Sequence, residues 1–198
     1  MNRKWLVPGI IIGIIVVLGM LIIGGYNGLV GQRENVNNAL ANVDTQYQRR
    51  SDLVKNLVAT VKGAANFEQE TLTQVTEARA KATSISIDPS NATPEQLAQY
   101  QQSQGELSQA LGRLLAVTEN YPELKSVANF QDLQVQLEGT ENRIAVARQD
   151  YNAVVTTYNT TISRFPTNLT AGVFGFDRYT TFKADQGSED APTVDFNS

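Results

Sequence analysis

The chain has 198 residues and a formal net charge of −4, and it contains neither cysteine nor histidine. It can therefore form no disulfide and no thiolate nucleophile, and it lacks the most frequent general base and metal ligand of proteins. Four acids in residues 184–198 account for the whole net charge, and a neutral body with an acidic tail is a poor electrostatic match for nucleic acid.

Residues 6–23 form an almost wholly apolar, uncharged run, LVPGIIIGIIVVLGMLII. About 20 residues of this kind span a bilayer as one helix, and Trp5 and Tyr26 flank the run where aromatic rings favour the headgroup region. The run is longer than the apolar part of a usual signal peptide, and no small-residue cleavage site follows it. We therefore predict an uncleaved transmembrane anchor over residues 1–27, with the lipid bilayer as its partner.

The charges around this run favour a cytoplasmic N-terminus. Arg3 and Lys4 precede the run, whereas Arg33 follows it with Glu34 beside it. Basic residues are retained on the cytoplasmic side of a membrane span. We therefore expect a single-pass protein of the cell membrane whose helical domain lies outside the cytoplasm, on the periplasmic or extracellular side.

Beyond the anchor, a first series of residues repeats with the spacing of packed helices: Val36, Leu40, Val43, Tyr47, Arg50, Val54, Leu57 and Val61. Arg50 interrupts this seam, and a buried cation needs a carboxylate. The candidate partners on the later helices are Glu106, Glu119, Glu138 and Glu141. The helix weakens at Gly63-Ala-Ala-Asn66 and resumes towards Ala82, which leaves open one kinked helix or two separate helices.

Turn-forming residues at 84–93 separate this region from a second series. Thr93, Pro94 and Gln96 match a capping box with proline in the first helical position and predict a helix start. The second seam consists of Leu97, Tyr100, Gln104, Leu107, Leu111, Leu114, Thr118 and Tyr121, and Pro122 ends it. A short connector then makes the second and third helices antiparallel neighbours.

The third and longest series contains no proline and predicts a helix of roughly 54 Å. Its seam consists of Phe130, Leu133, Leu137, Thr140, Ile144, Ala147, Tyr151, Val154, Tyr158, Ile162 and Phe165. A single helix cannot bury such a seam in water. The fold class we predict is therefore all-α, with the N-terminal transmembrane helix followed by an elongated antiparallel bundle of three to four long helices over residues 28–183.

Pro166 stops the third helix, and an aromatic cluster follows it: Val173, Phe174, Phe176, Tyr179 and Phe182. Large apolar side chains tend to be buried, which favours a C-terminal flap packed over one end of the bundle. The alternative is an exposed segment that contacts a partner. Residues 184–198 lack any periodicity and are expected to form an acidic disordered tail.

Catalytic or metal-binding patterns are scarce. The candidate carboxylates are Glu68, Glu70, Asp132, Glu138 and Glu141. A hydrolase would need two of them across a cleft, with the pKa of one raised, whereas charges beside helical seams usually pair with cations on neighbouring helices. Those cations would be Arg50, Arg79, Arg113, Arg143 and Arg148. We therefore predict no catalytic, metal-binding or cofactor-binding residue, and a protein that is not an enzyme.

Two repeated dipeptides, Tyr151-Asn152 and Tyr158-Asn159, lie seven residues apart on one stripe of the third helix. They could form a ligand-binding box. Because both tyrosines occupy seam positions, the pattern favours rings packed in the seam with polar atoms at its edge.

These stretches together resemble the LemA family of bacterial membrane-anchored helical proteins. The matching pieces, in chain order, are Tyr26-Asn-x-Leu-Val30, Arg49-Arg-x-Asp-Leu53, Asn56-Leu-Val58, Val61-Lys-Gly63, Val75-Thr-Glu-Ala-Arg79, Glu119-Asn-Tyr-Pro-x-Leu-Lys125, Leu137-Glu-Gly-Thr-Glu-Asn-Arg143, Ala147-Arg148, Tyr151-Asn152, Tyr158-Asn159 and Phe165-Pro166. The resemblance implies an all-α bundle, single-pass anchoring and no established enzymatic activity.

This chain departs from the family pattern at three positions. Relatives often carry proline where Lys55 stands, so a straighter first helix is expected here. They often carry histidine where Phe67 stands, so a catalytic histidine common to the whole family is not expected. Many relatives have a lipid-accepting cysteine where this chain has Gly25. Such relatives place their body outside the cytoplasm, which supports the same orientation here.

Two classes of function remain. The first is a structural scaffold or self-assembling interaction module at the membrane, whose partner is a second copy of the chain or another membrane protein. Gly9 and Gly13 form a GxxxG pair, which indicates either close packing of two spans or simply the frequency of glycine in membrane helices. The alternative is an accessory subunit that regulates a membrane protease or transporter.

Overall fold

The computed structural model describes residues 3–63, 67–88 and 92–183, and these parts of the chain are helical apart from turns and one extended C-terminal segment. The helices are α1 (Arg3–Lys62), α2 (Gln69–Ser84), α3 (Pro94–Thr118), α4 (Pro122–Lys125), α5 (Ala128–Ser163) and α6 (Thr167–Phe174). The prediction of an all-helical protein with one long apolar N-terminal helix is confirmed.

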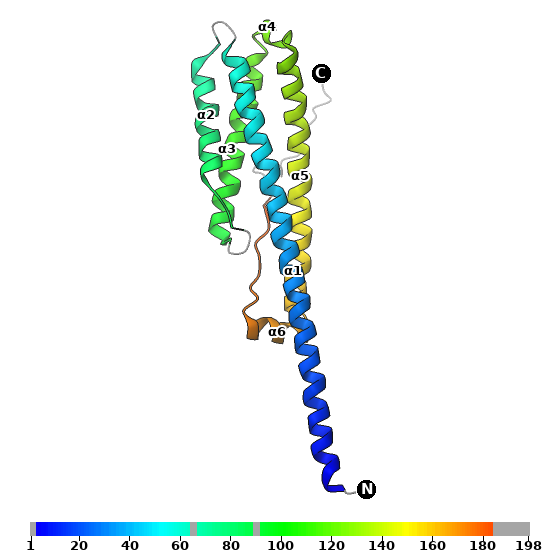
Figure 1. The fold of residues 1–198 in the computed structure, drawn as a ribbon. Helices are drawn as coiled ribbons and strands as arrows, with labels where there is room; N and C mark the ends of the chain where they lie inside the picture. Colours follow the sequence, from blue (N-terminus) through cyan, green and yellow to red (C-terminus); the bar gives the residue numbers. More distant parts are fainter. Residues whose placement is uncertain (1–2, 64–66, 89–91, 184–198) are drawn as a thin grey trace, which may run out of the picture.

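Figure 1 shows how the helices are arranged. Helices α1 and α5 run side by side along the long axis, and the hairpin of α2 and α3 packs against the half that lies farther from the N-terminus. The short helix α6 lies crosswise at the other end of the bundle, beside α1 and α5. The N-terminal part of α1 projects alone beyond α6.

Helix α1 continues without a break from the apolar run into the bundle. Every predicted seam position from Val36 to Val61 is at most 4% exposed. By contrast, the large apolar side chains between Ile10 and Ile23 are 48–68% exposed, because no other described segment covers them. This is the one described helix long and apolar enough to cross a membrane, and a bilayer would supply the apolar environment that its surface requires.

The alternatives at residues 63–66 are decided in favour of two separate helices, since α1 ends at Lys62 and α2 begins at Gln69 and packs back against α1. The predicted capping box of α3 is confirmed. The Thr93 hydroxyl accepts a hydrogen bond from the Gln96 amide at 3.2 Å, and the Gln96 side chain accepts one from the Thr93 amide at 3.0 Å.

Two seam positions predicted for the third helix are wrong. Val155 is fully buried in place of Val154, which is only half-buried, so the buried residues on either side of Tyr151, Ala147 and Val155, are both four positions away from it. Phe165 is 79% exposed because α5 ends at Ser163, two residues before it. The side chain of Phe165 therefore leaves the bundle.

The core divides into two apolar clusters along the long axis. One lies in the half nearer the N-terminal projection and includes Leu29, Val43, Tyr151 and Tyr158. The other lies in the distal half under the α2–α3 hairpin and includes residues such as Val54, Leu114 and Leu137. A set of polar side chains separates the two clusters.

A packed C-terminal flap is present, but residues 175–183 run along the side of the bundle and not, as predicted, over its end. Gly175 ends α6 in the left-handed conformation, with φ of 68°, and the Phe176 amide donates to the Ala171 carbonyl at 3.0 Å. This glycine C-cap turns the chain, which then runs back along the bundle in an extended form (Figure 1). Phe176 and Phe182 are buried, whereas Phe174 is 49% and Val173 79% exposed, so the predicted cluster divides between a packed flap and an exposed part.

Candidate functional site

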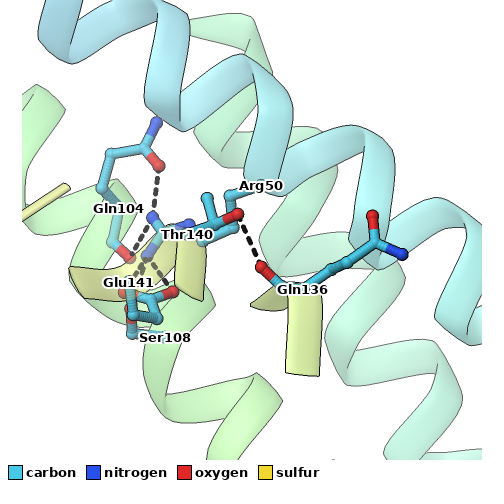
Figure 2. Close-up of polar contacts among 6 residues, drawn as sticks. All are labelled: Arg50, Gln104, Ser108, Gln136, Thr140 and Glu141. Atoms are coloured by element: carbon cyan, nitrogen blue, oxygen red, sulfur yellow. Dashed lines mark hydrogen bonds and ion pairs between the residues drawn. The ribbon is translucent and has the colours of Figure 1, made fainter. Parts of the chain in front are cut away.

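The polar side chains between the two apolar clusters centre on Arg50 of α1, which is 1% exposed. Its Nη1 donates to the Ser108 hydroxyl at 2.6 Å and to the Glu141 carboxylate at 3.0 Å, and its Nη2 donates to the Gln104 side-chain oxygen at 2.5 Å (Figure 2). The Tyr47 ring lies 5.0 Å from the guanidinium carbon. We call Arg50, Gln104, Ser108 and Glu141 the polar layer.

The polar layer joins the long helices to one another. Gln104 and Ser108 come from α3 and Glu141 from α5, so one guanidinium bonds two neighbouring helices. The Gln104 amide also donates to the Ala82 carbonyl of α2 at 3.2 Å. A slip of α5 along α1 would leave a buried cation without its carboxylate, and a slip of α3 would remove its neutral acceptors Gln104 and Ser108, so this layer favours one register of these helices.

The prediction that Arg50 pairs across the bundle is confirmed, and the partner is Glu141. Of the other candidates, Glu106 pairs with Lys81 at 2.6 Å. Of the other arginines expected to pair with acids, Arg79 and Arg148 donate to the main-chain carbonyls of Ser51 and Lys183.

The candidate carboxylates do not assemble into a cleft. Glu68 and Glu70 lie at the start of α2 and Asp132 in the first turns of α5, and all three are exposed. Glu138 is exposed one turn before Glu141, whose carboxylate is occupied by Arg50. Within the described residues, no group of three or more acidic side chains is placed to hold a metal ion.

The shifted pKa values also point away from acid–base chemistry at neutral pH. Burial raises the pKa of the Tyr151 and Tyr158 hydroxyls to about 12. Burial and a 2.6 Å hydrogen bond to Asp44 raise the pKa of Tyr100 well above its usual range. These phenols stay protonated and neutral, whereas a general base must have a pKa near the working pH.

The concave surfaces are small. A pocket of about 130 Å³ lies beside the polar layer between α1 and the α2–α3 hairpin, and Asp44, Ser51 and Tyr100 line it. A second, of about 300 Å³, lies where Gln46 of α1 meets Arg143 of α5. Ligand pockets usually hold roughly 300–1,000 Å³ and bury most of the ligand. The first pocket is smaller than this range, and the second only reaches its lower limit.

A second constellation, which sequence reasoning placed only in part, binds the C-terminal segment to the bundle. Asn159 donates from its side-chain amide to the Tyr179 carbonyl at 2.8 Å and accepts from the Tyr179 amide at 3.0 Å. Asn152 bonds Phe182 in the same two-way manner, at 3.0 and 2.9 Å. Gln101 of α3 does so with Lys183, at 2.8 and 3.2 Å. A carboxamide carries both a donor and an acceptor. It can therefore satisfy both the N–H and the C=O of one residue in an extended segment, as the backbone of a neighbouring β-strand would.

The aromatic rings follow the same repeat. Tyr158 packs on Tyr179 with ring centroids 5.2 Å apart, and Tyr151 packs on Phe182 at 5.1 Å. The Tyr151 hydroxyl donates to the Thr180 carbonyl at 3.0 Å. The rings therefore pack in the seam, as their spacing favoured, and the asparagines at its edge bind the chain's own C-terminal segment. The sequence feature that indicates this contact is the presence of two later aromatic residues, Tyr179 and Phe182, one for each Tyr-Asn dipeptide of the helix.

Helix α6 crosses α1 at the end of the apolar run. A Cβ atom on Gly25 would lie 3.4 Å from the Thr170 hydroxyl, so the two helices approach closely there. The Tyr26 ring contacts Phe174 and Phe176 at 4.9 and 5.6 Å, and the Arg33 guanidinium lies 5.3 Å from the Phe176 ring. These contacts support α1 where it leaves the apolar run.

Over the described residues, the fold and this arrangement define a membrane-associated helical protein with one candidate span near its N-terminus. The sequence model of the LemA family matches residues 39–196, most of the chain. The protein therefore belongs to the LemA family.

Curated relatives agree with this assignment. The chain is 30% identical over 186 residues to magnetosome protein MamQ 2 of Paramagnetospirillum magneticum, which covers 85% of this chain and 68% of the relative. It is 27% identical to magnetosome protein MamQ of Magnetospirillum gryphiswaldense with the same coverage. It is 26% identical over 149 residues to protein LemA of Metamycoplasma hominis, covering 75% of this chain and 64% of that protein.

Proposed function

We propose that this protein is a non-enzymatic membrane scaffold, which holds a rigid helical bundle at a fixed position on a bilayer and assembles with further copies of itself. The observation that supports this role is the continuity of α1, whose 60 residues contain both the apolar run and the buried seam of the bundle. A helix shared in this way leaves no linker about which the bundle could turn.

The organisation proposed for this role has three parts. Residues 1–27 anchor the chain, residues 28–183 form the elongated antiparallel bundle, and residues 184–198 form an acidic tail that lies outside the described residues. The polar layer supports the scaffold role because it sets the helices in one register, and rigidity is the property that a scaffold requires.

The relatives support a role at a membrane. Two of the three relatives described above are named magnetosome proteins. We carry over only the association with a membrane, because function is set by particular surfaces and sites and a shared fold does not transfer it.

The orientation that we propose places the bundle outside the cytoplasm, on the basis of Arg3 and Lys4 before the apolar run. A protease added to intact spheroplasts would then remove the bundle. Protection of the bundle, with cleavage of a tag at the N-terminus, would contradict this orientation.

The alternative function is an accessory subunit of a membrane protease or transporter. Purification of the full chain from its native membranes in mild detergent, followed by native mass spectrometry, separates the two roles. A homo-oligomer supports the scaffold, whereas a complex with a second protein in fixed stoichiometry supports the accessory subunit. Gly13→Ile, at a position where no protein atom lies within 4 Å of an added Cβ, tests whether the spans pack on each other in a homo-oligomer.

A further inference from the structure

The end of the bundle nearest the apolar run carries an exposed apolar surface that the core does not use. Phe165 and Val173 are each 79% exposed, and Leu169 between them is 60% exposed. Leu169 and Val173 are four residues apart within α6, so they lie on one face of that helix. Phe165 lies two residues before the helix begins. We call Phe165, Leu169 and Val173 the apolar face of α6.

The opposite face of α6 is the one that packs on the protein. Thr170 and Ala171 are buried, and Thr170 lies against Gly25 of α1. The apolar face is therefore exposed to solvent because α6 packs on the bundle through its other face. Three large apolar side chains exposed within nine residues of sequence require an explanation, since exposed apolar patches on soluble surfaces usually mark a binding site.

The position of α6 along α1 indicates what covers this face. The apolar run ends at Ile23, and α6 crosses α1 at Gly25, which is about 3 Å farther along a helix. Helix α6 lies crosswise to α1 at the end of the bundle from which the run projects (Figure 1). When the run spans a bilayer, α6 therefore lies at the level where acyl chains meet headgroups.

The chemistry of the segment suits that level. No charged residue occurs between Phe165 and Phe176, whereas Arg164 precedes this stretch and Asp177 and Arg178 follow it. The free backbone groups at the ends of so short a helix need water, so they exclude deep insertion but not a shallow position in the plane of the interface.

We propose that α6 is a second membrane contact, an interfacial helix whose apolar face inserts into the outer acyl region of the same bilayer that α1 spans. Two contacts with one membrane surface would fix the tilt of the bundle as well as its distance from the bilayer. Because the contact is apolar, it takes lipid regardless of headgroup charge. The proposal depends on the span but not on the scaffold role.

The test uses the full chain in phosphatidylcholine vesicles. The natural sequence has no cysteine, so Val173→Cys gives a single site for an environment-sensitive fluorophore at an exposed position. Leu169→Cys reports on the same face. Val135→Cys is the matched control, since Val135 is 67% exposed on α5 and lies between Leu133 and Leu137, which pack in the distal cluster far from the apolar run.

We expect nitroxide-bearing phospholipids to quench the fluorophore at residues 169 and 173 severalfold more than at residue 135, and aqueous iodide to show the reverse order. High salt and replacement of part of the lipid by phosphatidylglycerol should leave this pattern unchanged. Equal lipid quenching at residues 173 and 135 would overturn the proposal, as would quenching that requires anionic lipid. Protection of residue 173 from both quenchers, growing with the protein-to-lipid ratio, would assign the face to a second copy of the chain instead.

Discussion

Arg50 and Glu141, which lie 91 residues apart in the sequence, form an ion pair at 3.0 Å across the middle of the bundle. The pair is asymmetric, because the arginine side chain is 2% exposed and the glutamate side chain 43%. The carboxylate can therefore be solvated by water, whereas the guanidinium depends on protein partners. Arg50 is the residue through which the polar layer affects stability.

We expect Arg50→Met to destabilise the bundle by roughly 3–5 kcal/mol, because it leaves Gln104 and Ser108 without their donor inside the protein. Arg50→Lys keeps the charge but loses the planar fork that bonds both α3 and α5, so its cost should be smaller. Glu141→Gln leaves the buried guanidinium without its counter-charge, so it should cost more than the ~1 kcal/mol typical of an exposed ion pair, although the Glu141 side chain is itself partly solvated. Thermal and denaturant unfolding of the full chain in detergent measures all three.

Arg49→Met is the matched control, because Arg49 is the exposed neighbour of Arg50 on α1. It should leave the unfolding curve unchanged. A double-mutant cycle of Arg50 and Glu141 gives the coupling between them. Equal effects of Arg49→Met and Arg50→Met would mean that the polar layer does not contribute to stability.

A second prediction concerns the seam of α5. Ile144 is 3% exposed, and Ile144→Asp would place a carboxylate without a cation inside the bundle, at a cost of several kcal/mol. The cooperative melt followed by circular dichroism should be lost. Val146→Asp, two residues away at a position 56% exposed, should melt like the unaltered chain. Identical melts for the two variants would contradict the assignment of the buried face.

Every position that periodicity predicted for the buried seam of α1 is buried. Leu29, Ser51 and Leu53 are buried as well and lie outside that seam, because α1 also packs against α2 and α6. Periodicity failed near the end of α5, where the neighbour changes: beyond Tyr151 the C-terminal segment covers the helix, and Val155 is buried in place of Val154. Spacing along one helix carries no information about where a later segment will lie.

The sequence alone also could not predict which glutamate pairs with Arg50. Arg50 within an apolar seam indicated that a carboxylate was required, but four candidates satisfied that requirement. The decision depends on the relative register of α1 and α5, which is set by packing along the whole length of both helices. In the same way, the asparagine contacts depend on the turn at Gly175, which directs the C-terminal segment back over α5.

A third prediction concerns the asparagine contacts. Asn152→Ala removes two hydrogen bonds to the main chain of Phe182, which lowers the free energy of opening of the C-terminal segment by roughly 1–3 kcal/mol. Trypsin cleavage after Arg178 should then be about 5- to 150-fold faster, while the melting temperature of the bundle changes little. Asn142→Ala, at an exposed asparagine of the same helix, is the control. Unchanged cleavage would mean that the aromatic contacts alone hold the segment.

A fourth prediction concerns alkaline pH. The pKa of Tyr151 and Tyr158 is about 12 in the folded protein and about 10 in the unfolded chain. Folding therefore favours the protonated phenols, so their contribution is fully present below pH 10 and is lost as the pH rises from 10 towards 12. Tyrosinate absorbance should show an early phase from exposed tyrosines and a late phase coincident with loss of helix. Titration of all seven tyrosines near pH 10 with the helices intact would contradict their burial.

The central claim is that α1 joins the membrane span and the bundle as one rigid helix, and its weakest point is the exit from the bilayer. Gly24, Gly25, Gly28 and Gly31 lie there within eight residues, and each glycine disfavours a helix by about 1 kcal/mol relative to alanine. Packing of Thr170 and Phe174 against this stretch opposes that tendency.

Amide hydrogen exchange of the full chain in phosphatidylcholine nanodiscs, resolved over residues 24–31, tests the claim most directly. A continuous helix predicts that these amides exchange as slowly as those of residues 40–54, whose helix is packed in the bundle. Exchange of the amides of residues 24–31 within seconds, with those of residues 40–54 still protected, would mean that a flexible linker joins the span to the bundle. That result would contradict a scaffold of fixed geometry.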